Sequence, residues 1–255
     1  MVSFKTDNGD TFQYPSSLQD ITLKKYIEFI DFVESTKPKI LLDIDTANEK
    51  IYDAIQIKDN KGLESAKNEL NQLIDNIDDV VKYQQLHPYY ARVVSFFSGL
   101  DVAYILGQDG GTGMRVDHLT WLYTHTLNIF HELPEVEYSN VMEVDGELWY
   151  LPERFMTDST VIEFAEAAQF QANLAKVEGG QWKALAKVMC VIVRKKDEQY
   201  SDKLLKREEI FLNWNLYDCW KVAFFLRKRI ETLQLSSAIY TNILNLRQLK
   251  QELTD

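Results

Sequence analysis

The sequence PYYARVVSFFSGLDVAYIL, residues 88–106, is apolar almost all round a helix and predicts the central core helix of a mainly helical protein. Pro88 at its start suits the first turn of a helix, where the missing N–H is not needed. The whole chain of 255 residues holds only 10 Gly and 5 Pro. So few breakers favour long helices over many short strands.

A unit made of a β-hairpin, a proline and a helix occurs twice in the sequence. VSFKTDNGDTFQYP at residues 2–15 and VMEVDGELWYLP at residues 141–152 both contain an Asn-Gly or Asp-Gly turn between short β-type runs. A helix is predicted after each hairpin, capped by Asp20 in the first copy and beginning at about Asp158 in the second. The repeat suggests two related halves, or two hairpins that pair into one small sheet.

Apolar residues also recur at steps of three and four after a turn expected at Lys61-Gly62. They form an a/d seam, which predicts either a helical hairpin or a coiled-coil packing surface, and a further helix is expected at about residues 46–57. The seam consists of Leu63, Ala66, Leu70, Leu73, Ile77 and Val80. Further along, Asp117 is expected to cap a helix, and one long helix is expected over residues 208–233.

The fold class predicted from these patterns is mainly α, or α+β: a helical bundle with two short β-hairpins, in which the hairpin–helix unit is repeated. Residues 1–134 would contain the first hairpin and a helical bundle. Residues 135–255 would contain the second hairpin and a helical region that ends in a long C-terminal helix. The two regions can equally form one continuous domain.

Charge is unevenly spread along the chain, whose net charge is −11. Residues 1–180 carry 30 Asp and Glu against 14 Lys and Arg, whereas residues 181–255 carry 9 against 14. A molecule polarised in this way can stack head to tail or meet an oppositely charged neighbour. Two solvated surfaces of different sign explain the same pattern.

The two cysteines, Cys190 and Cys219, lie in apolar helical patterns, with no CxxC pair or Cys/His cluster. We interpret both as small buried hydrophobic residues, without a disulfide or a metal. The N-terminus does not resemble a signal peptide, and charges interrupt every apolar stretch before 18 residues, so no membrane span is expected. The protein is therefore expected to be made in a reducing compartment such as a cytoplasm.

The segment GQDGGTG, from Gly107 to Gly113, is the candidate for phosphate binding. It lacks the Lys-Ser/Thr of a P-loop and the preceding strand of a dinucleotide fold, so a connector or a loop ordered by a partner is favoured. A small nucleotide-binding enzyme that uses this loop remains the alternative from another class. His118, His125 and His131 lack the spacing of a zinc pair and are interpreted as core or surface residues. We therefore predict no catalytic, cofactor-binding or metal residues, no cofactor, and a protein that is not an enzyme.

Two basic clusters, Arg194-Lys195-Lys196 and Arg227-Lys228-Arg229, flank an aromatic segment at residues 211–225. Such a combination can bind nucleic acid, but the pI of about 4.9 argues against it, and nucleic acid is not expected among the partners. Acidic groups on a protein neighbour suit the second cluster better. The aromatic residues of this segment are too widely spread for one stripe of a helix, so the core or a partner would bury the helix on several sides. These residues are Phe211, Trp214, Tyr217, Trp220, Phe224 and Phe225.

Residues 182–229, WKALAKVMCVIVRKKDEQYSDKLLKREEIFLNWNLYDCWKVAFFLRKR, resemble small helical proteins encoded in the structural modules of tailed bacteriophages. The helix ITLKKYIEF at residues 21–29 is similar to these proteins as well. The resemblance rests on packing positions, so it carries over no functional residue. It implies a virion connector, tail or cargo component, or a tail-assembly chaperone, in the virion or the host cytoplasm. The implied partners are other phage structural proteins and further copies of this chain.

Overall fold

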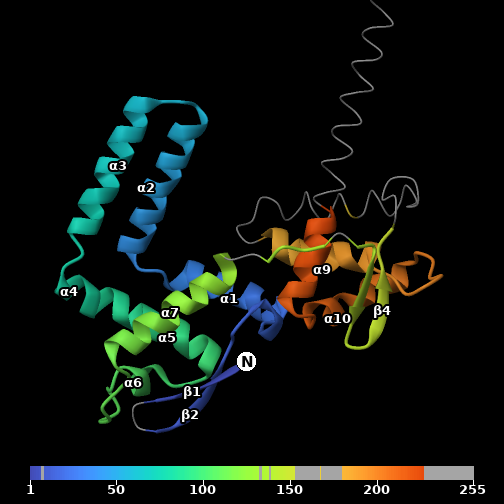
Figure 1. Ribbon diagram of the computed structural model, residues 1–255, viewed down its shortest axis with the longest axis horizontal. Coiled ribbons are helices and arrows are strands. Elements are labelled where there is room, and N and C mark those ends of the chain that lie inside the picture. The colour runs from blue at the N-terminus through green and yellow to red at the C-terminus, as the bar shows by residue number, and fades with distance from the viewer. Residues whose placement is uncertain (7–8, 132–133, 138, 153–166, 168–179, 227–255) are drawn as a thin grey trace, which may run out of the picture. The chain divides into compact units, whose positions relative to one another are not determined.

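The structure is a computed structural model that describes residues 1–6, 9–131, 134–137, 139–152, 167 and 180–226. The chain divides into two compact units. Unit 1 comprises Met1–Ser17 and Glu28–Leu133, and unit 2 comprises Leu18–Ile27 and Pro134–Asp255. Helices dominate the described residues and each unit contains one antiparallel hairpin, which confirms the predicted fold class (Figure 1).

Both predicted hairpins are present, one in each unit. In unit 1, β1 (Val2–Lys5) pairs with β2 (Thr11–Tyr14), with Phe4 opposite Phe12. In unit 2, β3 (Val141–Val144) pairs with β4 (Glu147–Tyr150). The two hairpins form separate two-stranded sheets, so the alternative of one shared sheet is wrong. A two-stranded hairpin is marginally stable by itself and needs a further strand or packing against a helix.

The first helix begins slightly later than predicted. Asp20 does not cap it, because Asp20 is the last residue of a short 3₁₀ helix, η1 (Leu18–Asp20). The following helix, α1, is Leu23–Thr36, and its cap is Thr22, whose Oγ1 accepts a hydrogen bond from the Lys25 N–H at 3.2 Å. The prediction of Asp20 was wrong because Thr22 offers the same chemistry nearer to the first turn.

The core of unit 1 gathers around α5 (His87–Ser98) and α7 (Val116–His131), which pack on each other. The single helix predicted over residues 88–106 is wrong, because left-handed Gly99 (φ 73°) ends α5 and a short helix, α6 (Val102–Ile105), follows. Both pieces still supply the core, as the apolar character of residues 88–106 predicted. Its buried residues are Phe12, Tyr14, Ala91, Val94, Ile105, Met114, Leu119 and Leu122.

The break between α5 and α6 has a local cause. A carboxylate at Asp101 accepts a hydrogen bond from the Ala103 N–H at 2.7 Å and so caps α6. Asp117, the other predicted cap, lies within the first turn of α7, where it forms an ion pair with Arg115 at 2.6 Å. That cap was wrong by two residues, since α7 already begins at Val116 and its cap position is therefore Arg115.

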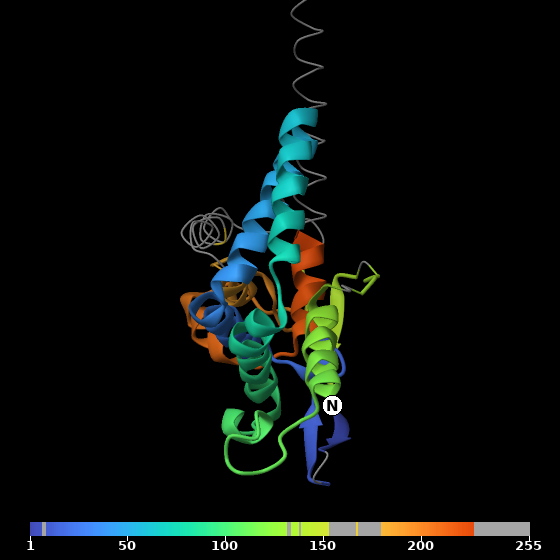
Figure 2. The same ribbon diagram turned by 90° about the vertical axis from the view of Figure 1, so that its left-hand side faces the viewer.

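A helical hairpin extends from unit 1, as the a/d seam predicted. It consists of α2 (Lys39–Gln56) and α3 (Asn60–Asp75), which pack on each other with Ala47, Ala54 and Ala66 buried between them. Figures 1 and 2 show this pair standing away from α5 and α7 of the same unit. The seam therefore supplies the packing that holds the two helices together.

The limits of this hairpin differ from the prediction. The turn expected at Lys61-Gly62 is wrong, because both residues lie in the first turn of α3 and the chain reverses at Lys58, which is left-handed (φ 57°). Ile77 and Val80 belong to no seam, since α3 has ended before them and Val80 lies in a short helix, α4 (Asp79–Val81). A π-helical segment, η2 (Lys82–Leu86), then leads into α5.

Unit 2 builds its described part from short helices around one hairpin. These are α9 (Gly180–Ile192), a 3₁₀ helix η3 (Asp202–Arg207), α10 (Glu208–Leu212) and a helix over 216–226. The single long helix predicted over 208–233 is therefore wrong at its first third. The interruption follows Leu212, where α10 ends.

Asn215 explains the interruption. Its Oδ1 accepts a hydrogen bond from the Asp218 N–H at 2.9 Å and so caps the helix over 216–226. The backbone of Asn215 also forms an isolated antiparallel bridge with Thr22. These long-range backbone bonds, including Leu23 N–H to Trp214 O at 2.9 Å, replace the helical bonds that a continuous helix would have made.

Both cysteines are free and buried in unit 2, which confirms their interpretation as small hydrophobic residues. Burial raises the pKa of the Cys190 thiol to about 12, and it raises the pKa of Cys219 as well. Thiols protonated to this degree are poor nucleophiles.

Some predictions fall outside the described residues. These are the helix expected from Asp158, the end of the long helix after residue 226, and the basic cluster Arg227-Lys228-Arg229. Within the part of the chain that the structure covers, no helix has both the length and the apolar character needed to cross a bilayer.

Candidate functional site

The glycine-rich segment from Gly107 to Gly113 forms a closed turn between α6 and α7. Gly107 and Gly113 are both left-handed, and their backbones are so close that a Cβ on Gly113 would lie 2.8 Å from the Gly107 nitrogen. The Gly111 N–H is already engaged, because it donates to the Asp109 carboxylate at 3.0 Å. A phosphate in this loop would meet that carboxylate. The geometry therefore favours a connector over a nucleotide site.

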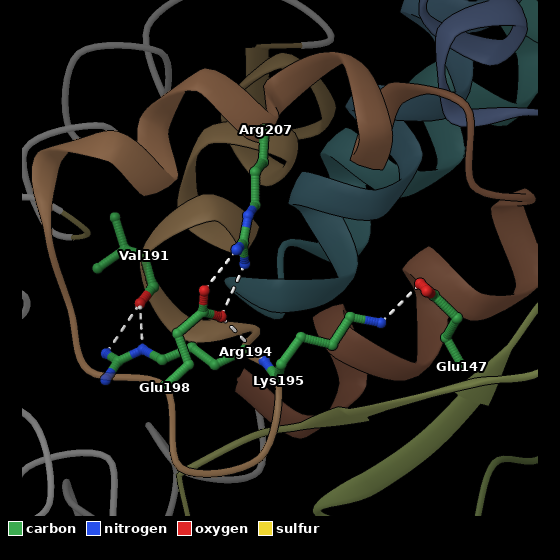
Figure 3. A network of polar contacts seen from close by, with 6 residues as sticks. All are labelled: Glu147, Val191, Arg194, Lys195, Glu198 and Arg207. Carbon is green, nitrogen blue, oxygen red and sulfur yellow. Dashed lines mark hydrogen bonds and ion pairs between the residues drawn. The ribbon is translucent and has the colours of Figure 1, made fainter.

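Arg194, from the first basic cluster, is folded into unit 2 (Figure 3). Its backbone pairs with Tyr150 of β4 through two hydrogen bonds of 2.7 and 3.0 Å. Its guanidinium donates to the Val191 carbonyl from Nε at 3.3 Å and from Nη2 at 3.0 Å. Arg194 thus closes part of the free edge of β4, and its donors are directed at the protein's own backbone.

Lys195 is also engaged within unit 2. Its ammonium forms an ion pair with Glu147 at 2.6 Å (Figure 3). The same ammonium lies 3.7 Å from the centre of the Trp149 ring. Of the three residues in this cluster, Lys196 is thus the one whose side chain is exposed.

Glu198 and Arg207 form a bidentate ion pair that fixes the loop after α9 (Figure 3). Their side chains are about one quarter exposed. The Lys195 N–H donates to Glu198 Oε2 at 3.1 Å, which closes a tight turn whose residue Asp197 is left-handed (φ 61°). The hydrogen bond from Arg207 lowers the pKa of Glu198, although partial burial opposes it. These bonds position the loop after α9 within the described part of unit 2.

Half of the aromatic residues in the segment 211–225 are buried in the core, and the other half are partly buried. Phe211, Trp214 and Phe225 are buried, and the rings of Phe211 and Trp214 lie 5.5 and 5.3 Å from Trp149. Of the two alternatives left by the sequence, burial by the core thus applies to these three rings. They are not available to a partner.

The outer edge of β1 is open. The Thr6 N–H donates to the Asp10 carbonyl at 2.7 Å, so Thr6 and Asp10 are a hydrogen-bonded pair of residues. In antiparallel strands such pairs alternate with pairs whose N–H and C=O groups point away from the partner strand. The N–H and C=O groups of Ser3 and Lys5 therefore point away from β2. Within the described residues, β2 is the single strand that pairs with β1. Unpaired groups of this kind are ready to bind another extended chain.

Exposed aromatic side chains lie beside this edge. Trp121 of α7 is 48% exposed, its ring is 5.4 Å from that of Phe4, and it stacks on His125 at 5.1 Å with an interplanar angle of 3°. His118 lies 6.4 Å from Phe4. We call the open edge of β1 and these four side chains the edge patch. It combines backbone hydrogen-bonding groups with an apolar platform, which is the chemistry of strand addition.

The structure also places the three histidines that the sequence analysis considered for a zinc site. His118 and His125 belong to the edge patch, and His131 is exposed at the end of α7. The His125 Nε2 donates to the Pro15 carbonyl at 3.1 Å, because a carbonyl can only accept. Among the residues that the structure describes, no three His, Cys, Asp or Glu side chains are grouped to hold a metal ion.

A buried hydrogen bond anchors the edge patch to the core. Tyr14 of β2 is fully buried and its hydroxyl lies 2.6 Å from Thr126 Oγ1, which donates to the Leu122 carbonyl at 2.9 Å. Since Thr126 uses its proton there, the Tyr14 hydroxyl is the donor between the two. Burial raises the pKa of Tyr14, against a smaller opposite effect of this hydrogen bond. The phenol therefore stays protonated and able to donate.

Sequence reasoning did not single out the edge patch. The signal that was available is the spacing of His118, Trp121 and His125, which places three aromatic rings on one face of a helix. Whether that face is covered depends on the rest of the fold. In comparisons with protein-family models, curated proteins and solved structures, no match to this chain is found.

The closed turn makes a testable prediction. Gly113→Ala forces an L side chain into a left-handed position and also against the Gly107 backbone, whereas Gly110→Ala forces the same strain (φ 91°) into open space. We expect Gly110→Ala to lower the free energy of unfolding by about 1–2 kcal/mol and Gly113→Ala to lower it by at least about 1 kcal/mol more. Urea unfolding followed by circular dichroism measures both. Equal losses would contradict the close backbone packing.

The ion pair of Glu198 predicts a pH dependence. The pKa of Glu198 is lower in the folded state than in the unfolded state. The ion pair therefore stabilises the fold fully above the unfolded pKa of about 4.3, and this stabilisation is lost as the pH falls through the folded-state pKa. Glu198→Gln should therefore cost about 1 kcal/mol at pH 7 and progressively less below pH ~4. The control is Glu209→Gln, which removes an exposed pair with Lys24 and should cost less at every pH. A loss of stability in Glu198→Gln that does not change with pH would contradict this role of the ion pair.

Proposed function

We propose that this protein works by binding other proteins through the edge patch, as a structural or assembly component of a tailed bacteriophage. The proposal that the edge patch binds other proteins rests on the half-exposed Trp121 beside an open strand edge. Tryptophan is enriched among the residues that dominate binding energy, and an open edge supplies backbone hydrogen bonds at the same place. The phage setting rests on the sequence resemblance of residues 182–229.

This function has two versions, a virion component and an assembly chaperone, which differ in whether the protein is present in the mature particle. A connector, tail or cargo component stays in the mature virion, whereas a tail-assembly chaperone binds the same kind of partner and leaves. Binding rather than catalysis is supported by how the polar groups are used. The ion pair of Glu198 and Arg207 and the donors of Arg194 all hold the protein's own backbone or side chains.

The test is quantitative mass spectrometry of purified virus particles from cells that carry the gene. A fixed copy number per particle is expected for a virion component. Absence from particles, together with co-purification with tail proteins during assembly, is expected for a chaperone. A protein absent from both would overturn the phage assignment.

The edge patch predicts which substitution weakens the interaction. Trp121→Ala should reduce binding by about 2 kcal/mol, or roughly 30-fold, and so deplete the protein from particles or assembly intermediates. Tyr52→Ala is the control, because Tyr52 is a 63% exposed aromatic residue on α2, away from the patch. Thermal unfolding of both variants checks that a loss of binding is not a loss of folding. If the Tyr52 variant is depleted and the Trp121 variant is not, the patch is the wrong surface.

A further inference from the structure

We propose that β1 binds β1 of a second copy of this chain, antiparallel and centred on Phe4, so that two hairpins form one four-stranded sheet. This inference rests on the proposed function and names one partner of the same edge patch. The groups that would pair are the N–H and C=O of Ser3 and Lys5, which point away from β2.

The register follows from the positions of those groups. Centring on Phe4 places Ser3 of each strand opposite Lys5 of the other, so that all outward groups of both residues find a partner. Centring on Lys5 would place two like charges directly opposite each other, which destabilises a sheet. In the register centred on Phe4 the strand is therefore complementary to itself, and a two-fold axis generates both halves of the contact.

The side chains of the edge patch suit the same arrangement. Phe4 shares a face of the sheet with buried Phe12, and on that face its ring contacts Trp121. A strand added about 4.8 Å beyond β1 would bring the second Phe4 onto this face, next to the first and to Trp121. Phe4 would then meet its copy at a non-hydrogen-bonded position, where side chains approach most closely. The exposed part of Trp121 would be covered.

The edge has few of the features that prevent such pairing. Proteins protect open edges with prolines, bulges or charges that point toward the covered face. β1 reads Val-Ser-Phe-Lys, pairs with β2 without a bulge, and carries one charge, on Lys5. Lys5 alternates with Phe4, so it lies on the solvent face. The other hairpin differs, because Arg194 occupies the free edge of β4.

Ser3→Pro tests the hydrogen bonds. Proline removes the outward N–H of Ser3 but no bond to β2, so the hairpin can persist while the edge is blocked. Gln13→Pro is the matched control, since Gln13 is the partner of Ser3 in β2 and its N–H faces the opposite edge. Sedimentation velocity and native mass spectrometry of the untagged chain should show dimers. Ser3→Pro should raise the dissociation constant at least about tenfold, and Gln13→Pro should leave it unchanged.

A cross-link tests the register independently of any loss of folding. Residues opposite each other in a bonded pair have Cα atoms about 5.5 Å apart, within the range that a disulfide spans. Mixing Ser3→Cys protein with Lys5→Cys protein under mild oxidation should therefore give a disulfide-linked dimer, whereas either protein alone should not. The native cysteines are buried and do not compete.

The outcomes separate this inference from the proposed function. A monomeric chain that gives no mixed cross-link overturns self-pairing, and so does a cross-link of Ser3→Cys with itself. If that monomer still enters virus particles and Trp121→Ala still depletes it, the patch binds a different partner and the proposed function stands. A dimer that persists in Ser3→Pro shows that the copies associate elsewhere.

Discussion

The hydrogen bond between Tyr14 and Thr126 is the interaction on which the first hairpin depends. A fully buried phenol without an acceptor would cost about 1–3 kcal/mol, so Tyr14 holds β2 at one position against α7. Around it, the ring of Tyr14 meets Phe12 and Phe97 edge-on, both at 6.3 Å. Once β2 is fixed, the pairing of the hairpin decides where Phe4 lies. The edge patch is thus a consequence of a contact made on the other strand.

The two hairpins show how one sequence pattern can lead to different surfaces. Both have short strands, a left-handed glycine in the turn and a proline after the second strand. In the second hairpin, Arg194 pairs with Tyr150, and Ser139 Oγ both donates to and accepts from the Val141 backbone. The edges of β3 and β4 are therefore partly occupied by their own chain. In the first hairpin, the outward groups of Ser3 and Lys5 meet no other strand among the described residues, which is why we place the binding site there and not on its counterpart.

The sequence was informative where structure is decided locally. Asp-Gly and Asn-Gly turns specified the hairpins, and apolar residues at steps of three and four specified the helical pair α2–α3. It failed where distant backbone groups compete with a helix. The break at Asn215 depends on bonds to residues near Thr22, almost two hundred positions away, and no periodicity contains them. The edge patch was missed for the same reason, because the exposure of Trp121 is a property of the assembled unit.

The size of the edge patch limits the kind of contact it can make. Four residues of strand and a single exposed tryptophan correspond to the small interfaces of transient complexes, not to the large apolar interfaces of obligate dimers. The net charge of −11 adds long-range repulsion between copies. A contact of this size gives the free chain a modest affinity for its copy, and a high local concentration strengthens the pairing further. A ring or stack of subunits provides that high local concentration. Strand pairing at this edge therefore suits a component whose copies are gathered by an assembly.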